Sequence, residues 1–448
     1  MDELGPTVVV TPCPHALLIN LPEATPMQDQ PLSRDISQQH LEVSRRYFMH
    51  LGTAGFAAMG YPSLLRAQDA DRNILEETIA DLEYLTHHKE FELVERGKPL
   101  PYKLPPEKRL AIGMERESWK LDVIADRETN ARVDNPLSRE KGTALDFKGL
   151  LKLAGKRPTR FLKVMTCNNM ATPLGMGLWE GVPLREAIWA ARPSANIRRV
   201  FYYGHHNEDP EQIFRSSLPI GRVLEDPPGD HPVILCYKLN GEWLGGKNGG
   251  PVRMIVPEAY GVKSVKWLKT VVLTNAPAAN DTYASGNNDI DSWMKTMCRF
   301  IHKPTKVKAG SPIPLTGLAQ VGVGGLGKVQ VWIKPQQDGE WPKDDPYFTK
   351  APWQDAAILP PPEKWGGGLP GGKLPPDVRF FTAEGKPTHW PMRYTIAHWA
   401  TLLKGMVPGK YDIYCRTIDN GGNAQPMPRP FRKSGRNNIE GSLITIEG

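Results

Sequence analysis

The sequence has few cysteines, and they lack the spacings of metal ligands or of a disulfide framework. Five occur in 448 residues without a CxxC or CxxCH pair, at Cys13, Cys167, Cys236, Cys298 and Cys415. This scatter argues against a disulfide-rich scaffold, a zinc ribbon and covalently attached c-type haem. Because the number is odd, at least one thiol has no disulfide partner within the chain.

The chain also lacks a dense run of lysines and arginines that would mark a nucleic-acid footprint. Its formal net charge is +7, which is moderate, so we expect no nucleic-acid partner. The excess positive charge is compatible with anionic substrates or an acidic partner. With 40% hydrophobic and 23% charged residues, the chain is long enough for two packed domains of roughly 150 to 200 residues and a tail.

The N-terminal apolar run is short. Residues 1–43 are proline-rich, polar and aperiodic, which predicts a disordered extension or a start codon placed too early. The next segment, SRRYFMHLGTAGFAAMGYPSLLRAQDA, starts with Arg45 and Arg46 and then carries little charge. Its apolar part is shorter than the ~20 residues of a membrane-spanning helix, which favours a twin-arginine export signal over an amphipathic helix. We expect residues 1–68 to be extension and signal, cleaved near Ala67, and the protein to be periplasmic.

Residues 69–278 are predicted to form an α+β domain. Apolar residues at helical spacing between residues 69 and 100 predict a helix, and residues 119–126 alternate as a strand does. The segments LDFKGLLKLAG and VPLREAIWAA predict further helices, while RRVFYYG and the residues before Cys167 predict strands. Such a mixture of short strands and helices is typical of an α+β domain.

The composition shifts in residues 279–448 toward strands, turns, tryptophan and proline. KVQVWIKPQQDGEW and MVPGKYDIYCRTIDNGGNAQP alternate apolar and polar residues and contain Asp-Gly or Asn-Gly turns. Regular strands separated by turn signals predict an antiparallel β-sandwich. Residues 360–376 form a glycine- and proline-rich loop for which we predict no regular structure.

The stretch FLKVMTCNNMATPLGMGLWEGVPL places Cys167 where an apolar strand gives way to a polar turn. A thiol at such a junction can act as a ligand at the mouth of a site. An isolated cysteine, however, is more often a small buried hydrophobic residue without a function. The local sequence alone favours that structural role, so other motifs must decide.

Those motifs lie further along the chain. They are a YxxNG turn at residues 237–241, a GxPVRxxVP run at residues 249–257 and the segment VKWL, expected to be a strand, at residues 265–268. With the strand that ends at Cys167, they resemble the molybdopterin domain of the sulfite oxidase family. The resemblance implies the sulfite oxidase fold for the α+β domain. It also implies an immunoglobulin-like dimerisation domain for the β-sandwich, and hence a homodimer.

A molybdenum-molybdopterin cofactor and a set of site residues follow from the resemblance. Cys167 would be the protein's ligand to molybdenum, which suits a soft thiolate, and Tyr237 and Trp179 would lie at the active site. The pterin and its phosphate would be held by His206, Asn207, Arg215, Ser216, Ser217, Asn248, Arg253 and Lys266. Structural roles are the alternatives: a strand position for Tyr237, core packing for Trp179, and surface cations for Arg253 and Lys266.

Two other patterns carry less weight. The glycines of VGVGGLG at residues 321–327 match GxGxxG, but a dinucleotide site needs that loop to open a helix, and the strand KVQVWI follows instead. The segment HHNED at residues 205–209 offers metal-ligand side chains. Adjacent histidines rarely point both rings at one ion, and no third histidine completes the spacing. We therefore expect neither an NAD site nor a separate metal site.

The activity implied by the resemblance is oxygen-atom transfer coupled to a two-electron change at molybdenum, with sulfite or a related small sulfur compound as substrate. Because no haem motif is present in the sequence, electrons would pass to an external carrier such as a c-type cytochrome. Twin-arginine export carries folded proteins, which suits an enzyme that must receive its cofactor before leaving the cytoplasm.

Two departures from the family pattern bear on the substrate. Sulfite-oxidising members carry an arginine a few residues after the ligand cysteine, whereas the run here, CNNMAT, has none. They also carry an RNH-like triplet upstream, and the candidate equivalent in this sequence, FELVERG, offers only Arg96. An oxyanion without arginine partners would be held weakly. Two alternatives therefore stay open: a reductase of the same fold acting on sulfoxides such as methionine sulfoxide, and a non-catalytic exported β-sandwich protein.

Overall fold

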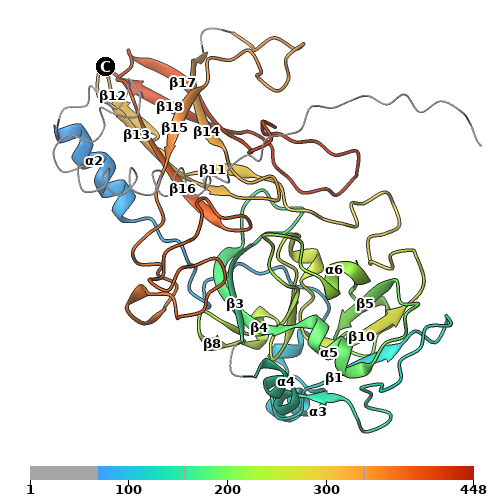
Figure 1. The fold of residues 1–448 in the computed structure, drawn as a ribbon. Helices are drawn as coiled ribbons and strands as arrows, with labels where there is room; N and C mark the ends of the chain where they lie inside the picture. The colour runs from blue at the N-terminus through green and yellow to red at the C-terminus, as the bar shows by residue number, and fades with distance from the viewer. Residues whose placement is uncertain (1–68, 156–157, 337–338) are drawn as a thin grey trace, which may run out of the picture. The chain divides into compact units, whose positions relative to one another are not determined.

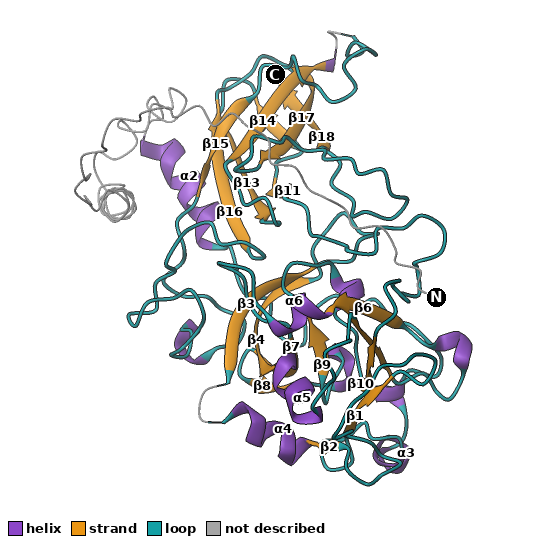
Figure 2. Ribbon diagram, turned by 45° about the vertical axis from the view of Figure 1, so that its right-hand side comes forward, coloured by secondary structure: helices purple, strands orange, loops and turns teal. Residues whose placement is uncertain are grey.

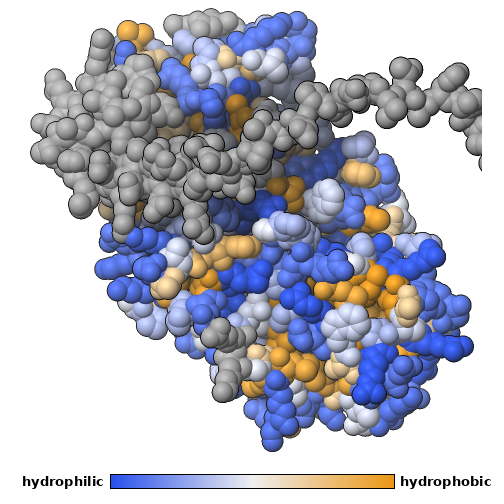
Figure 3. All heavy atoms as spheres, viewed as in Figure 1, coloured by the Kyte–Doolittle hydropathy of each residue, from blue (hydrophilic) through white to orange (hydrophobic). Residues whose placement is uncertain are grey.

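The computed structural model describes residues 69–155, 158–336 and 339–448, all within the unit Thr53–Gly448. The predicted extension, twin-arginine signal and cleavage position lie outside the described residues. Within the described part of the chain, no helix is both long enough and apolar enough to cross a membrane. On the face shown in Figure 3, the described residues are mainly hydrophilic, with hydrophobic residues between them.

The first sheet of the α+β part has the strand order β2-β1-β10-β5-β6 (Figure 1). Its strands are β1 (Lys120–Ala125), β2 (Leu145–Asp146), β5 (Arg199–Gly204), β6 (Arg215–Pro219) and β10 (Leu268–Thr274). β1 pairs in parallel with β10, and β5 pairs antiparallel with β10 and β6. The predicted VKWL strand is wrong in its bounds, because β10 begins only at Leu268 and Trp267 has a left-handed φ of 52°.

The second sheet carries the strand that ends beside Cys167. Its strands are β3 (Thr159–Met165), β4 (Gly175–Pro183), β7 (Ile234–Leu239), β8 (Glu242–Trp243) and β9 (Arg253–Ile255). β4 pairs antiparallel with β3 and β7, and β9 pairs with β7. Almost every residue of β4 is buried, which places this sheet inside the domain.

Short helices pack against strands of both sheets and confirm the predicted α+β character. They are α3 (Pro106–Ala111), α4 (Phe147–Ala154), α5 (Leu184–Ala191) and α6 (Ile220–Leu224), with short 3₁₀ turns η2 (Pro101–Lys103), η3 (Pro210–Gln212), η4 (Gly246–Asn248), η5 (Gly261–Lys263) and η7 (Pro370–Gly372). Asp146 caps α4 because its carboxylate accepts a hydrogen bond from the backbone N–H of Gly149, at 2.6 Å. The buried faces of α4 and α5 pack with β1, β5 and β10 in one apolar core.

The last part of the chain folds as the predicted β-sandwich (Figure 2). Its strands follow the order β11-β13-β16-β15-β14-β17-β18-β12. They are β11 (Met297–His302), β12 (Lys306–Lys308), β13 (Ile313–Gln320), β14 (Lys328–Pro335), β15 (Gln354–Ile358), β16 (Ile396–Leu403), β17 (Gly409–Ile418) and β18 (Glu440–Glu447). Strands from both halves of this order meet in a single core, so the sheet closes over its own apolar face. The glycine run before β14 opens no helix, as predicted.

Two segments join the sandwich to the α+β part. Helix α2 (Asp69–Ala80) lies where a helix was predicted, and its Leu75 packs against Ala400 and Leu402 of β16. The loop 360–376 has little regular structure, yet its Trp365 is buried in a cluster with residues of β3 and β4. The domain limits at residues 69, 278 and 279 remain predictions.

Candidate functional site

Cys167 lies just after β3, in a turn held from both sides. Its carbonyl accepts the backbone N–H of Met170 at 3.1 Å, and the carbonyl of Asn168 accepts the backbone N–H of Arg436 at 3.2 Å. The thiol is half-buried and packs against an apolar cluster from β3, β4 and β7. Cys236, by contrast, is fully buried, and burial raises the pKa of its thiol to about 12. Cys167 is therefore the more accessible sulfur of this cluster.

The structure separates the two aromatic residues predicted for the active site. Trp179 on β4 belongs to the apolar cluster against which Cys167 packs, and its indole Nε1 donates to the carbonyl of Lys163 at 2.9 Å. Tyr237 on β7 belongs to the other core, with its ring 6.3 Å from Phe147. Successive strand residues point to opposite faces. The position of Tyr237 therefore does not support a contact with a group bound at Cys167.

Arg253 is a buried cation that has no acidic partner in the part of the chain that the structure describes. Its side chain is on β9, and its guanidinium donates to the carbonyls of Asn248 at 2.8 Å and Ser264 at 2.6 Å, while Nε has no partner in the described protein. The guanidinium lies 5.5 Å from the ring centre of Trp179. Burial lowers the pKa of Arg253 to about 10. An anion at this point would relieve the cost of burying the charge.

Lys266 and Asn248 extend this polar region. The ammonium of Lys266 donates to the carbonyls of Val94 at 3.4 Å and Lys247 at 3.3 Å. Burial, followed by repulsion from Arg253, lowers the pKa of Lys266 to about 7. The amide of Asn248 donates to the carbonyl of His88 at 2.7 Å. These residues fit a phosphate-bearing cofactor, because the described residues give the two cations carbonyls and no carboxylate in ion-pair contact.

His206 and Asn207 lie in the loop after β5. His206 has a buried Nδ1 without a partner among the described residues, which leaves one ring nitrogen free for a cofactor. Asn207 has a left-handed φ of 55° and donates to Gln212 at 2.8 Å and to the carbonyl of Pro99 at 3.1 Å. Its amide therefore also fixes the loop. Across the described residues, no group of three or more His, Cys, Asp or Glu side chains could hold a metal ion.

Ser216, Ser217 and Arg215 on β6 are not arranged as an open phosphate cradle. The hydroxyls of Ser216 and Ser217 donate to the carboxylate of Asp281 at 2.9 Å and 2.6 Å, and Lys263 donates to the same carboxylate at 2.5 Å. Arg215 is exposed. The sequence motif placed these residues by position but could not show that an acidic residue after β10 already engages the hydroxyls.

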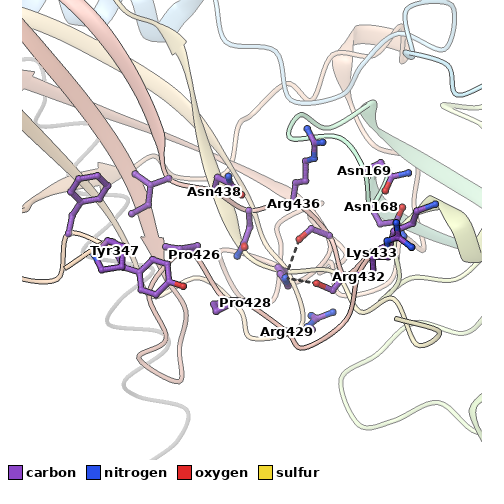
Figure 4. A pocket seen from close by; sticks show the side chains of 17 residues that line it. Asn168, Asn169, Tyr347, Pro426, Pro428, Arg429, Arg432, Lys433, Arg436 and Asn438 are labelled. Atoms are coloured by element: carbon purple, nitrogen blue, oxygen red, sulfur yellow. Dashed lines mark hydrogen bonds between the residues drawn. The ribbon is translucent and has the colours of Figure 1, made fainter. Parts of the chain in front are cut away.

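The structure also shows a cavity that the sequence did not indicate. The turn after β3 contributes Asn168 and Asn169 to a cavity of about 580 Å³, and the segment between β17 and β18 contributes Arg432, Lys433 and Arg436. Figure 4 shows these residues around the same space. Among the described residues, neither arginine has a carboxylate in ion-pair contact, and Lys433 lies 4.2 Å from the ring centre of Tyr283. The turn at Cys167 therefore borders a cationic cavity.

The sequence signal for this cavity is the run RPFRKSGR at residues 429–436. Four of its positions are basic, but nothing local predicts that the run reaches a turn after β3. Within the described ranges, Arg429 is the one cation of this run with an acidic partner, Asp289, at 2.7 Å. Arg432, Lys433 and Arg436 thus bring positive charge to the cavity that Asn168 and Asn169 of the CNNMAT run also line.

Comparison with known proteins identifies the α+β part. Residues 113–282 match the oxidoreductase molybdopterin binding domain. The NADPH nitrate reductase of Pichia angusta is 35% identical over 103 residues, which are 23% of this chain and 12% of that protein. The mitochondrial sulfite oxidase of Drosophila melanogaster is 30% identical over 126 residues, 27% of this chain and 21% of that protein. The chain thus spans only a small share of the length of these relatives.

One solved structure shares the arrangement of both parts. The sulfane dehydrogenase SoxCD from Paracoccus pantotrophus aligns with a TM-score of 0.51 and 16% sequence identity, over 83% of this chain and 92% of that one. At this identity the likeness concerns the fold. It supports the molybdenum-domain fold followed by a β-sandwich.

Proposed function

Because residues 113–282 match the oxidoreductase molybdopterin binding domain, we propose that the protein is a molybdenum enzyme that adds an oxygen atom to an anionic sulfur compound, with sulfite as the simplest substrate. The balanced reaction takes sulfite and water to sulfate, two protons and two electrons. The electrons pass singly to an external carrier such as a c-type cytochrome. Molybdopterin, when bound, would supply the two-electron redox change.

The chain's own residues have distinct tasks in this proposal. The Cys167 thiolate is the protein ligand to the metal, for which its half-buried position beside a polar turn is suitable. Arg253, Lys266 and Asn248 bind the anionic end of the cofactor with charge-assisted hydrogen bonds. Trp179 forms an apolar wall beside Cys167 and excludes water from it.

The observation that carries the choice of substrate class is the cationic cavity beside Asn168 and Asn169. Arg432, Lys433 and Arg436 give an oxyanion the guanidinium and ammonium donors that the CNNMAT run lacks. A neutral sulfoxide would gain little from them, so the sulfoxide reductase alternative is less well supported. The buried Arg253 and the half-buried Lys266 argue against a non-catalytic protein, because without an anionic cofactor these two cations have no evident use.

Nitrate reduction is a second candidate. Nitrate is also an oxyanion, and fungal NADPH nitrate reductases are among the relatives that share the domain. The cationic cavity suits both ions equally. Turnover of sulfite with an artificial acceptor, compared with turnover of nitrate with an artificial donor, separates the two.

Several features of the whole protein belong to the same proposal. Twin-arginine export to the periplasm rests on Arg45 and Arg46, and it suits an enzyme loaded with cofactor before export. Dimerisation through the sandwich follows from the resemblance, the domain limits 69–278 and 279–448 from the change in composition, and the absence of haem from the lack of a haem motif in the sequence. Fractionation of the host cell and sedimentation of the purified protein test export and dimerisation.

The function is tested with protein matured in a host that makes molybdopterin. We expect sulfite oxidation with ferricyanide, and at least about a tenfold lower kcat/KM in the double variant Arg432→Gln, Arg436→Gln, mainly through KM, because two long-range attractions are lost. The matched control is Lys148→Gln, an exposed cation on α4. Turnover of methionine sulfoxide but not of sulfite or nitrate would contradict the oxyanion proposal.

A further inference from the structure

The cavity beside the Cys167 turn is large for a simple oxyanion. It encloses about 580 Å³, within the range of sites for small organic ligands. Sulfite has four heavy atoms and displaces roughly two or three water molecules, each of which takes about 30 Å³ of liquid. Most of the cavity would therefore stay filled with water if sulfite were its only occupant.

The two ends of the cavity differ in chemistry. One end is formed by Asn168, Asn169 and Lys433, and the other by Tyr347 (Figure 4), next to which Phe348 also lines the cavity. Pro426 and Pro428 also line the cavity and add apolar surface to its wall (Figure 4). The cavity thus joins a cationic, amide-rich end to an aromatic and proline-rich one.

The aromatic end is held in place. Phe348 packs with its ring centre 5.6 Å from that of Trp332 and 5.2 Å from that of Tyr414. The carboxylate of Asp345 accepts hydrogen bonds from the backbone N–H of Thr349 at 2.8 Å and from its hydroxyl at 2.7 Å. Contacts on both sides therefore fix the loop that presents Tyr347.

The wall of the cavity also holds a donor without an acceptor among the described residues. Asn437 lines the cavity and is only 4% exposed, and its Nδ2 has no partner among the described residues. Its Oδ1 accepts the backbone N–H of Met427 at 3.2 Å, which fixes the amide. A buried, unpaired donor is costly, so it points to a ligand with an acceptor at this position.

From these features we infer that the substrate carries its anionic sulfur group on an apolar body of about the size of an aromatic ring, as an organic sulfinate does. The inference rests on the proposed oxygen-atom transfer and names its substrate class. The reaction would be R–SO₂⁻ with water giving R–SO₃⁻, two protons and two electrons. One S–O bond forms, the C–S bond is kept, and the electrons leave for the same external one-electron acceptor.

Kinetics on the molybdenum-loaded protein test the preference. We expect kcat/KM for benzenesulfinate to exceed that for sulfite by at least about tenfold, because the ring adds stacking contacts at the aromatic end. The ratio of the two kcat/KM values should fall by roughly tenfold in Tyr347→Ala and stay near the wild-type value in Tyr347→Phe. Trp189→Ala, which removes an exposed aromatic residue on α5, is the control and should leave the ratio unchanged.

A binding measurement separates this inference from the proposed function. Calorimetry with the products should show benzenesulfonate binding at least about tenfold more tightly than methanesulfonate, with the difference lost in Tyr347→Ala. Equal binding of the two sulfonates, or an unchanged kinetic ratio in Tyr347→Ala, would overturn the inference while sulfite oxidation still stood. If the molybdenum-loaded protein turned over no oxyanion at all, the proposed function would be contradicted. The comparison of the two sulfonates would then still show whether the cavity binds an anion that carries an aromatic ring.

Discussion

Lys163 is a fully buried lysine on β3, close to the candidate site. Its ammonium donates to the carbonyls of Val164 at 3.1 Å and Ala259 at 3.0 Å. Burial lowers the pKa of Lys163 to about 7, with attraction from Glu258 opposing this shift and repulsion from Arg253 adding to it. The group therefore titrates in the folded protein near neutral pH, whereas a free lysine titrates near 10.4.

The sign of the pH effect follows from these two values. Between about pH 7 and pH 9 the unfolded chain keeps the lysine proton while the folded protein releases it, so the unfolding free energy rises with pH by up to about 1.4 kcal/mol per pH unit. We predict that the unfolding free energy of wild type, minus that of Lys163→Met, increases by roughly 2 kcal/mol over this range. Urea denaturation of the cofactor-free proteins measures it.

The pH range and the control matter for that prediction. The upper limit is set near pH 9, because closer to the ordinary lysine pKa of about 10.4 the unfolded chain also loses this proton and the difference levels off. Lys148→Met removes an exposed lysine and should show no such trend. A constant difference between wild type and Lys163→Met would mean that Lys163 stays charged in the folded protein.

At the scale of elements, the segment after β10 is anchored to β6 and η5 by one buried ion pair. Lys263 and Asp281 lie 2.5 Å apart, and their side chains are 2% and 6% exposed. Asp281 also accepts both hydroxyls of Ser216 and Ser217. Removal of one charge of such a pair leaves the other buried without compensation.

We therefore predict that Asp281→Asn lowers the unfolding free energy by about 3 to 5 kcal/mol. The matched control is Glu447→Gln, which breaks the pair with Lys306 at 2.8 Å, where the side chains are 49% and 70% exposed. This surface change should cost less than about 1 kcal/mol. If urea denaturation gave the same loss of unfolding free energy for both variants, the burial of Lys263 would not be the reason for the large effect of Asp281→Asn.

Local patterns predicted most elements of the chain but not their partners. Helices α4 and α5 and strands β1 and β14 lie where periodicity placed them, and β3 lies where the apolar run before Cys167 predicted a strand. The strand predicted for the VKWL segment is wrong in its bounds because Trp267 has a left-handed conformation. Its indole N–H donates to the carbonyl of Gly246 at 2.7 Å. No alternation of residues encodes such a tertiary contact.

The same limit applies to the site. Family motifs pointed to Cys167 and Arg253, which share the surroundings of Trp179. They also pointed to Tyr237, which faces the other core, because a motif gives a position in the chain but not the face of a strand. The sequence did not predict that Arg432 and Arg436 lie near the turn after β3, because this proximity depends on how the sandwich packs against the rest of the chain.

At the scale of the whole molecule, residues of the sandwich contact the strand and the turn that carry Cys167 in the molybdopterin-binding domain. The backbone N–H of Val164 on β3 donates to the carbonyl of Tyr394 at 2.7 Å, and Arg299 of β11 donates to the carbonyl of Ala171 at 2.6 Å. The hydroxyl of Thr166 donates to Gln320 of β13. The strand before Cys167 and the turn after it are therefore fixed by residues of both parts, and mutations in the sandwich should affect substrate binding.

X-ray absorption at the molybdenum edge tests the central claim most directly, with wild type and Cys167→Ser prepared in a molybdopterin-competent host. We predict about one molybdenum per wild-type chain, one fewer sulfur neighbour of the metal in the variant, an unchanged circular dichroism spectrum, and no oxyanion turnover by the variant. Identical sulfur coordination in the two proteins, or a wild-type chain that carries no molybdenum, would contradict the assignment of Cys167 as the ligand.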